Sequence, residues 1–377
     1  MVSWRRWGAV AAGVAVLIGI PPAAGRLSAR SSPMTAQALL TAIQGSGRAG
    51  YSGYAEADGG LALPLTSRFS GLADLLGGHT RLRVWWRTDR DWRVDAVGVT
   101  GETDLHRTGR GAWTWEYESN RATFSVEPAV RLPRHTDLDP AQFGRRLLSE
   151  AEPAEVVRLP TRRIAGRDAP GLRLHLNDPQ ATITRIDVWA DPGTGLPVRV
   201  EVYGAGQSRP ALQTGFLDFD PRTPDPATTA FRPPPGARTW LERDTDVAAM
   251  VDEISPVLPP DVLASYPLRH RVEGLGAVGT YGRGATVLVA VPLPGRVSGP
   301  LLDELGKAPG VRKTSAGVLL AVGPLTLLVA DAPQTVVLEG DPSGIFEVRS
   351  WLLAGTVTAD TLLRAAADLA AHPPRLR

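Results

Sequence analysis

The feature of this sequence that most restricts its fold is a two-residue alternation of apolar and polar side chains between residues 81 and 202. Alternation of this period predicts strands with one buried and one solvated face. Turn residues such as Asp191–Gly195 separate the runs, as in hairpins. The alternating apolar positions are Leu82, Val84 and Trp86; Trp92, Val94 and Ala96; Trp113, Trp115 and Tyr117; Ile186 and Val188; and Val198, Val200 and Val202.

Short helices interrupt these strands at two places. Thr35 is a suitable N-cap for a helix through Ala36–Ile43, and Asp139 with Pro140 opens a second helix over Ala141–Ser149. Strands and helices do not alternate in a βαβ rhythm, which argues against a parallel doubly wound sheet. The pattern predicts an α+β fold in which the helices cover one face of an antiparallel sheet or plug a partly closed barrel.

A second pattern begins after the proline-rich stretch Phe231–Gly236, where we expect the first sheet to end because consecutive prolines cannot continue a central strand. The later apolar runs are typical of buried strands, and Thr358 is the N-cap of a helix over Ala359–Ala371. We therefore expect one domain over residues 33–240 and a smaller α+β domain over residues 247–377. The apolar runs of the smaller domain are Thr286–Val291, Val318–Val322, Leu325–Ala330 and Val336–Leu338.

Residues 1–30 have the composition of an export segment. Arg5 and Arg6 precede an apolar run over Trp7–Ile20, and small residues follow it. This order is typical of a secretory signal peptide, and an uncleaved N-terminal membrane anchor is the alternative. We expect an extracytoplasmic protein that is secreted, periplasmic or tethered to the outer face of the cytoplasmic membrane. Since the chain has no cysteine, a lipidated cysteine is excluded.

Composition and residue spacing exclude several classes of function. The net charge is only +2, which does not predict nucleic-acid binding. The histidines are scattered without the spacing of a metal site, and no nucleophile elbow is present. The motif Gly274–Gly279 fits G-x-G-x-x-G, but a strand follows it, which favours a glycine-rich hairpin over a dinucleotide site. We therefore expect a non-catalytic protein without metal or cofactor.

The apolar strand face is the candidate ligand site. Aromatic residues concentrate between residues 86 and 124, and such a row forms either a filled core or the wall of an open apolar cavity. The sequence pattern leaves both alternatives open. The candidate ligand-binding residues on this face are Leu82, Val84, Trp86, Val94, Trp113, Trp115, Tyr117, Phe124, Val188, Val198 and Val200.

Several segments, in order, resemble the LolA/RseB group of extracytoplasmic proteins, in which "fRv…dG…W.y", "lWvDp.TglPlrve" and "F.pPpG" recur. The segments that carry the resemblance are Tyr51–Tyr54, Leu82–Asp95, Gly109–Tyr117, Ile186–Glu201 and Phe231–Gly236. Residues 268–283 and Leu353–Val357 faintly resemble the C-terminal domain of RseB-like proteins. The resemblance implies a half-barrel sheet wrapped over short helices, with an apolar cavity for acyl chains.

The resemblance also implies two functions. The first is a lipid or lipoprotein carrier or envelope sensor that buries acyl chains in the half-barrel. The alternative is an RseB-type regulatory protein whose partner is the extracytoplasmic domain of an anti-sigma factor. In both, the protein contacts the membrane through residues 1–30 if these are not cleaved.

Overall fold

The computed structural model describes residues 29–60, 77–98, 101–109, 111–126, 133–243, 255, 257–269, 276–337, 345–372 and 375–376. Nearly all of the predicted export segment, and Gly274 and Leu275 of the motif Gly274–Gly279, lie outside these residues. No helix in the described part of the chain has the length and apolarity needed to cross a bilayer.

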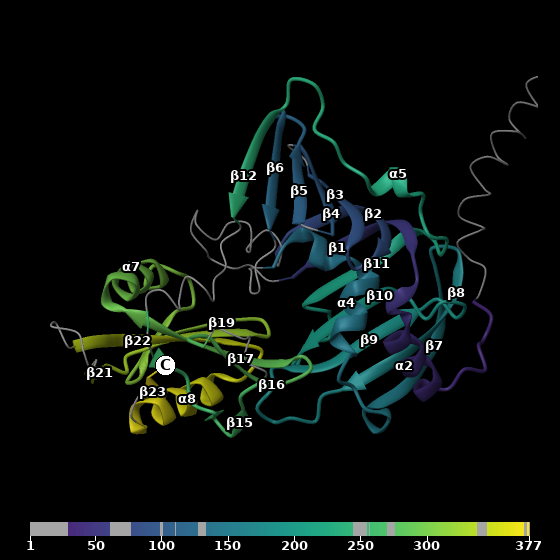
Figure 1. The fold of residues 1–377 in the computed structure, drawn as a ribbon. Helices are drawn as coiled ribbons and strands as arrows, with labels where there is room; N and C mark the ends of the chain where they lie inside the picture. The colour runs from purple at the N-terminus through teal and green to yellow at the C-terminus, as the bar shows by residue number, and fades with distance from the viewer. Residues whose placement is uncertain are drawn as a thin grey trace, which may run out of the picture.

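A large curved sheet of twelve strands forms the first half of the protein (Figure 1). Its order is β12-β6-β5-β4-β3-β2-β1-β11-β10-β9-β8-β7, and its pairs are antiparallel except β12 with β6. The predicted antiparallel, α+β character is therefore confirmed. The strands are β1 Tyr51–Gly59, β2 His79–Thr88, β3 Asp91–Val97, β4 Glu102–Thr108, β5 Gly111–Glu116, β6 Arg121–Val126, β7 Val156–Ile164, β8 Arg167–His175, β9 Ile183–Ala190, β10 Pro197–Gly204, β11 Leu212–Asp220 and β12 Arg238–Arg243.

The prediction that this sheet ends at Phe231–Gly236 is wrong. The proline-rich stretch is a crossover, and the chain then returns as β12 along the far side of β6. The prolines stay outside the hydrogen-bonded ladder, so their missing N–H groups do not prevent the chain from adding an edge strand. The parallel register aligns Arg238 with Arg121 and Leu241 with Phe124.

Two helices pack on the concave face of this sheet, α2 over Ala36–Gly45 and α4 over Pro140–Leu147 (Figure 1). Both begin where the sequence predicts, because the side chains of Thr35 and Asp139 accept backbone N–H bonds of the first turn. Leu39, Leu40 and Ile43 of α2 are fully buried over β7–β10. The short helices nearby are η1 Ser46–Arg48, η3 His135–Leu138, η4 Pro153–Glu155 and α5 Pro226–Thr229.

A second sheet of seven strands follows, with the order β16-β17-β22-β20-β19-β18 and β21 paired to β22. Helix α8 packs on one face and α7 on the other, which explains why its strands are apolar at consecutive positions. The elements are β16 Gly279–Arg283, β17 Thr286–Pro294, α7 Gly295–Leu305, β18 Arg312–Thr314, β19 Gly317–Val322, β20 Leu325–Ala330, β21 Gln334–Val337, β22 Ile345–Gly355 and α8 Ala359–Ala371, with the small pairs β13 Val257–Leu258 with β23 Arg375–Leu376 and β14 Val262–Leu263 with β15 Tyr266–Pro267.

The two sheets meet through polar contacts. Arg283 at the β16–β17 turn binds Glu155 at 2.7 Å and Glu152 at 3.1 Å. Nearby, the Tyr266 hydroxyl donates to Asp178 at 2.6 Å. These ion pairs are partly exposed, so each contributes little stability by itself. Together they connect the segment before β7 to the second sheet and the β8–β9 loop to the small β14–β15 pair.

A buried polar network anchors α4 to the first sheet. The Tyr51 hydroxyl donates to the carboxylate of Asp139, and the Gln142 side-chain amide donates to the Tyr51 oxygen at 3.0 Å. Asp139 is fully buried, and burial raises its pKa to about 7 against the hydrogen bonds from Tyr51 and from the Ala141 backbone. This carboxyl group therefore titrates near neutral pH in the folded protein.

The Asp139 carboxyl predicts a specific pH dependence of stability. Between about pH 4 and pH 7, the folded state holds a proton that the unfolded chain releases, so this group makes the free energy of unfolding fall as pH rises. In Asp139→Asn this component is absent. Urea unfolding at pH 4.5 and 7.5 should show that the wild type loses about 3 kcal/mol more than the variant over this range.

Asp218→Asn, at an exposed position of β11, is the control and should keep the wild-type pH dependence. Equal pH dependence in Asp139→Asn and the wild type would contradict the role of the buried carboxyl group.

Candidate functional site: the two faces of the curved sheet

Most of the predicted ligand-binding residues form a filled core. They pack against Tyr51, Leu138 and Ala141 on one side and against the buried face of α2 on the other. Of the two alternatives left open by the sequence, a filled core therefore describes this part of the concave face. The residues concerned are Leu82, Val84, Trp86, Val94, Val188, Val198 and Val200, all less than 9% exposed.

The expectation that Trp113, Trp115 and Phe124 share this face is wrong. In the register, Val94 lies opposite Leu105, and Leu105 lies opposite Thr114. Since successive residues of a strand point to opposite faces, Trp113 and Trp115 belong to the convex face. Tyr117, the remaining candidate, lies in the turn after β5 and is 72% exposed.

The convex aromatic residues have their own partner, Phe231. Its ring lies 5.7 Å from that of Trp113, 6.0 Å from that of Trp115 and 4.7 Å from that of His106. Trp113 also packs against Phe124 at 5.1 Å. The segment after β11 thus lies over the convex face of β3–β5, and these rings stabilise that crossover rather than lining a cavity.

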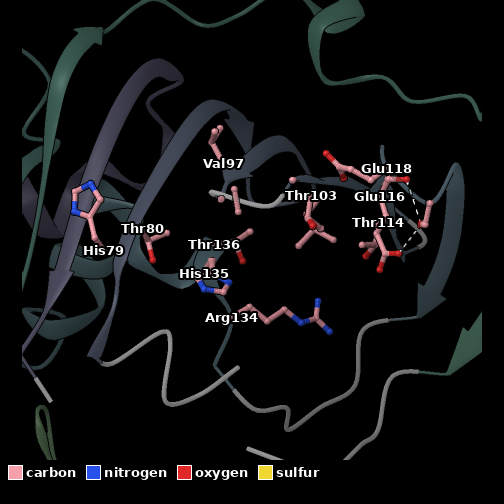
Figure 2. A pocket seen from close by; sticks show the side chains of 15 residues that line it. His79, Thr80, Val97, Thr103, Thr114, Glu116, Glu118, Arg134, His135 and Thr136 are labelled. Carbon is pink, nitrogen blue, oxygen red and sulfur yellow. Dashed lines mark hydrogen bonds between the residues drawn. The ribbon is translucent and has the colours of Figure 1, made fainter. Parts of the chain in front are cut away.

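Beyond the filled core, the concave face opens into a hollow of about 680 Å³ (Figure 2). One wall is the inner face of β2–β5, and Figure 2 shows Arg134, His135 and Thr136 on the opposite side, from the segment that precedes α4. The volume lies within the ~300–1,000 Å³ range of small-molecule sites. The lining residues are His79, Thr80, Ala96, Val97, Gly98, Gly101, Thr103, Leu105, Thr114, Glu116, Glu118, Ser119, Arg134, His135 and Thr136.

The wall of this hollow is amphipathic. Leu105 belongs both to the core and to the wall, so the apolar surface continues from one to the other. Next to it, Thr80, Thr103 and Thr114 each present a methyl and a hydroxyl group. This wall therefore suits a ligand that has an apolar part and hydrogen-bonding groups.

The two carboxylates of the hollow lie at its β5 end. Glu116 receives two hydrogen bonds from Arg121, at 2.6 and 2.9 Å, and these hold its pKa below the usual value. Glu118 accepts the backbone N–H of Glu102 at 3.1 Å. Both glutamates lie at the rim of the hollow. Glu116 points there because the inner face of β5 is the face opposite its tryptophans.

The alternation of apolar and polar residues does not identify the residues of this wall. One departure from that alternation, in β4, does point to it. In β4 the alternation breaks down, since Asp104, Leu105 and His106 are buried in succession. This strand buries polar residues on one face and carries threonine on the other. Such a strand has each face either covered by another part of the chain or occupied by a ligand. The convex face of β4 holds Asp104 and His106, and the concave face holds Thr103 and Leu105.

No protein-family model and no curated protein matches the chain. Among solved structures, the MucA/MucB complex of Pseudomonas aeruginosa is 16% identical, with 91% of this chain and 99% of that chain covered and a TM-score of 0.46. A further MucB structure is 14% identical, with 88% and 96% covered and a TM-score of 0.44. A LolA superfamily protein from Nitrosomonas europaea is 14% identical, with 52% and 98% covered and a TM-score of 0.24.

All three TM-scores lie below 0.5, so the function has to be inferred from the chain's own residues.

The convex aromatic cluster predicts energetic coupling between Trp113 and Phe231. A double-mutant cycle with Trp113→Ala and Phe231→Ala should give a coupling of about 0.5–1.5 kcal/mol in the free energy of unfolding. Phe216 lies on the concave side in the filled core, so the pair Trp113→Ala and Phe216→Ala is the control. That pair should be additive within about 0.5 kcal/mol. Additivity of Trp113 and Phe231 would contradict the observed packing.

Proposed function

We propose that this chain is a non-catalytic extracytoplasmic protein that binds the acyl chains of a lipid or lipoprotein in the concave hollow. The observation that carries the proposal is the amphipathic cavity of about 680 Å³, which continues the apolar core between the sheet and the segment 134–136. The signal-like composition of residues 1–30 supports a location outside the cytoplasm. The resemblance of the sequence motifs to the LolA/RseB group supports the class of ligand.

The site differs from the one that the sequence predicts. The ligand does not replace the packed strand face around Leu82 and Val84, which α4 and η3 cover, but occupies the adjacent wall around Leu105, Thr103 and Thr114. Its head group lies toward the charged rim that Glu118 and Arg134 help to form. We also propose the domain division at residues 240–247, with β12 extending the first domain to Arg243.

The expected affinity follows from the apolar surface that the ligand buries. Each CH₂ contributes ~0.8 kcal/mol, so about ten buried groups supply ~8 kcal/mol. Loss of translational freedom on binding offsets part of this. Because the wall also carries hydroxyl groups that must be satisfied, we expect micromolar rather than nanomolar binding.

Blocking the hollow tests the proposal. Thr103 is an exposed residue of the β4 wall, so Thr103→Trp should obstruct the cavity with little effect on folding. Displacement of a fluorescent fatty acid by palmitate should be at least about tenfold weaker in this variant, which corresponds to ~1.4 kcal/mol. Arg81→Trp adds the same side chain at an exposed position of β2, on the opposite face of the sheet, and should bind like the wild type.

Two results would contradict the proposal. One is a wild-type protein that binds no fatty acid. The other is equal binding by Thr103→Trp and Arg81→Trp, which would place the ligand outside the hollow.

A second function, regulation through an anti-sigma factor ectodomain, is favoured by the edge strand β12. Its outer edge has no neighbour among the strands that the structure describes. The side chains of Trp240 and Leu241 are 59% and 81% exposed, and Val126 of the neighbouring strand β6, which pairs with Arg243, is 58% exposed. An apolar sheet edge of this kind is a template for an extended partner segment.

Leu241→Glu separates this function from ligand binding. If a partner ectodomain adds to β12, the substitution should weaken the complex about tenfold or more in calorimetry and leave fatty-acid displacement unchanged. The natural ectodomain to test is that of an anti-sigma factor encoded in the same genome. Failure of the wild-type protein to bind this ectodomain would remove the regulatory function.

A further inference from the structure

Three side chains of metal-ligand type converge on the convex face of the sheet, on the side opposite the hollow. Asp95 of β3 lies directly across from Asp104 of β4, and His106 follows Asp104 on the same face. One potential ligand atom from each residue lies within 4.8 Å of the others. All three residues are buried, at 0%, 8% and 2% exposure. The sequence spacing does not reveal this group, because its members come from two strands.

His106 is held in the form that binds metal ions. Its Nδ1 lies 3.0 Å from the backbone carbonyl of Thr229. A carbonyl only accepts hydrogen bonds, so Nδ1 carries the proton and Nε2 keeps its lone pair. Metal-binding histidines are commonly oriented in this way by a carbonyl on the second nitrogen.

Asp104 has an oxygen that lacks a hydrogen-bond donor. Its Oδ1 is buried and accepts no hydrogen bond from the part of the chain that the structure describes. A buried carboxylate oxygen without a partner carries a large desolvation cost. Its other oxygen accepts a bond from Arg93 at 3.0 Å. A cation bound at this carboxylate would compensate the unpaired oxygen.

Arg93 is compatible with a bound cation. It donates to both oxygens of Asp95 at 2.7 Å as well as to Asp104. Each carboxylate oxygen retains a further lone pair, so the guanidinium can orient the two carboxylates while they bind a metal. Two buried carboxylates face one guanidinium, so one further positive charge would balance the group.

We propose that Asp95, Asp104 and His106 form a binding site for one divalent transition-metal ion, with zinc as the representative ion. An imidazole nitrogen with two carboxylates suits zinc and its neighbours, whereas calcium and magnesium prefer an all-oxygen set. Through the bond between His106 and Thr229, the ion would fasten the segment 225–231 over the convex face. That segment carries Phe231 and leads into β12, so the role is structural and independent of the hollow.

Zinc titration of the full-length chain after removal of metals with a chelator tests the proposal. Calorimetry should show one zinc ion per chain, and zinc should raise the midpoint of thermal unfolding because it binds the folded state. In Asp104→Asn and in His106→Gln, the zinc affinity should fall at least about tenfold. His175→Gln, at a histidine of β8 outside the cluster, is the matched control and should bind zinc like the wild type.

Asp104→Asn preserves the volume of the side chain, so it remains informative if His106→Gln does not fold. Cobalt provides a second readout, since its visible absorption reports the ligand set and should change in Asp104→Asn but not in His175→Gln. The proposal is overturned if the wild type binds no zinc, or if Asp104→Asn binds zinc as tightly as His175→Gln.

Discussion

The register of β4 between β3 and β5 is the constraint on which the rest of the structure depends. It aligns Asp95 with Asp104 and Leu105 with Thr114, and thereby decides which side chains point to each face of the curved sheet. A slip by one residue would send Trp113 and His106 to the concave face and threonines to the convex face. The cavity wall, the aromatic cluster and the ligand-type side chains are all consequences of this one alignment.

The two faces consequently have different roles. Near α2 and α4 the concave face is a solid apolar core, and only toward β3–β5 does it open into a hollow with threonines and charged groups. The convex face of the same strands is closed by the segment that contains α5 and Phe231, which covers the tryptophans and the buried ionic group. Ligand uptake on one face and structural reinforcement on the other are compatible, because the sheet separates them.

Local signals in the sequence predict the elements well. Thr35, Asp139 and Thr358 are the N-caps of α2, α4 and α8, and the alternating runs are strands of the first sheet.

The face of the sheet to which each strand's side chains point is less predictable. Alternation shows which residues of one strand share a face, but it carries no information across strands when an intervening strand, here β4, has lost the pattern. For this reason the pattern predicts the wrong face for Trp113, Trp115 and Phe124 and does not reveal the wall around Thr103. The return of the chain as β12 is also unpredictable, since it depends on a crossover and not on local propensity.

The central claim, that the concave hollow and not the packed aromatic face binds acyl chains, is tested most directly by a crystal structure with a brominated fatty acid. Anomalous scattering from bromine locates the ligand without reference to any assumed site. We expect a bromine peak between the β4–β5 wall at Thr103 and Thr114 and the segment 134–136. A peak beside Trp113 and Phe231 on the convex face, or a structure with the hollow free of ligand at saturating fatty acid, would contradict the claim.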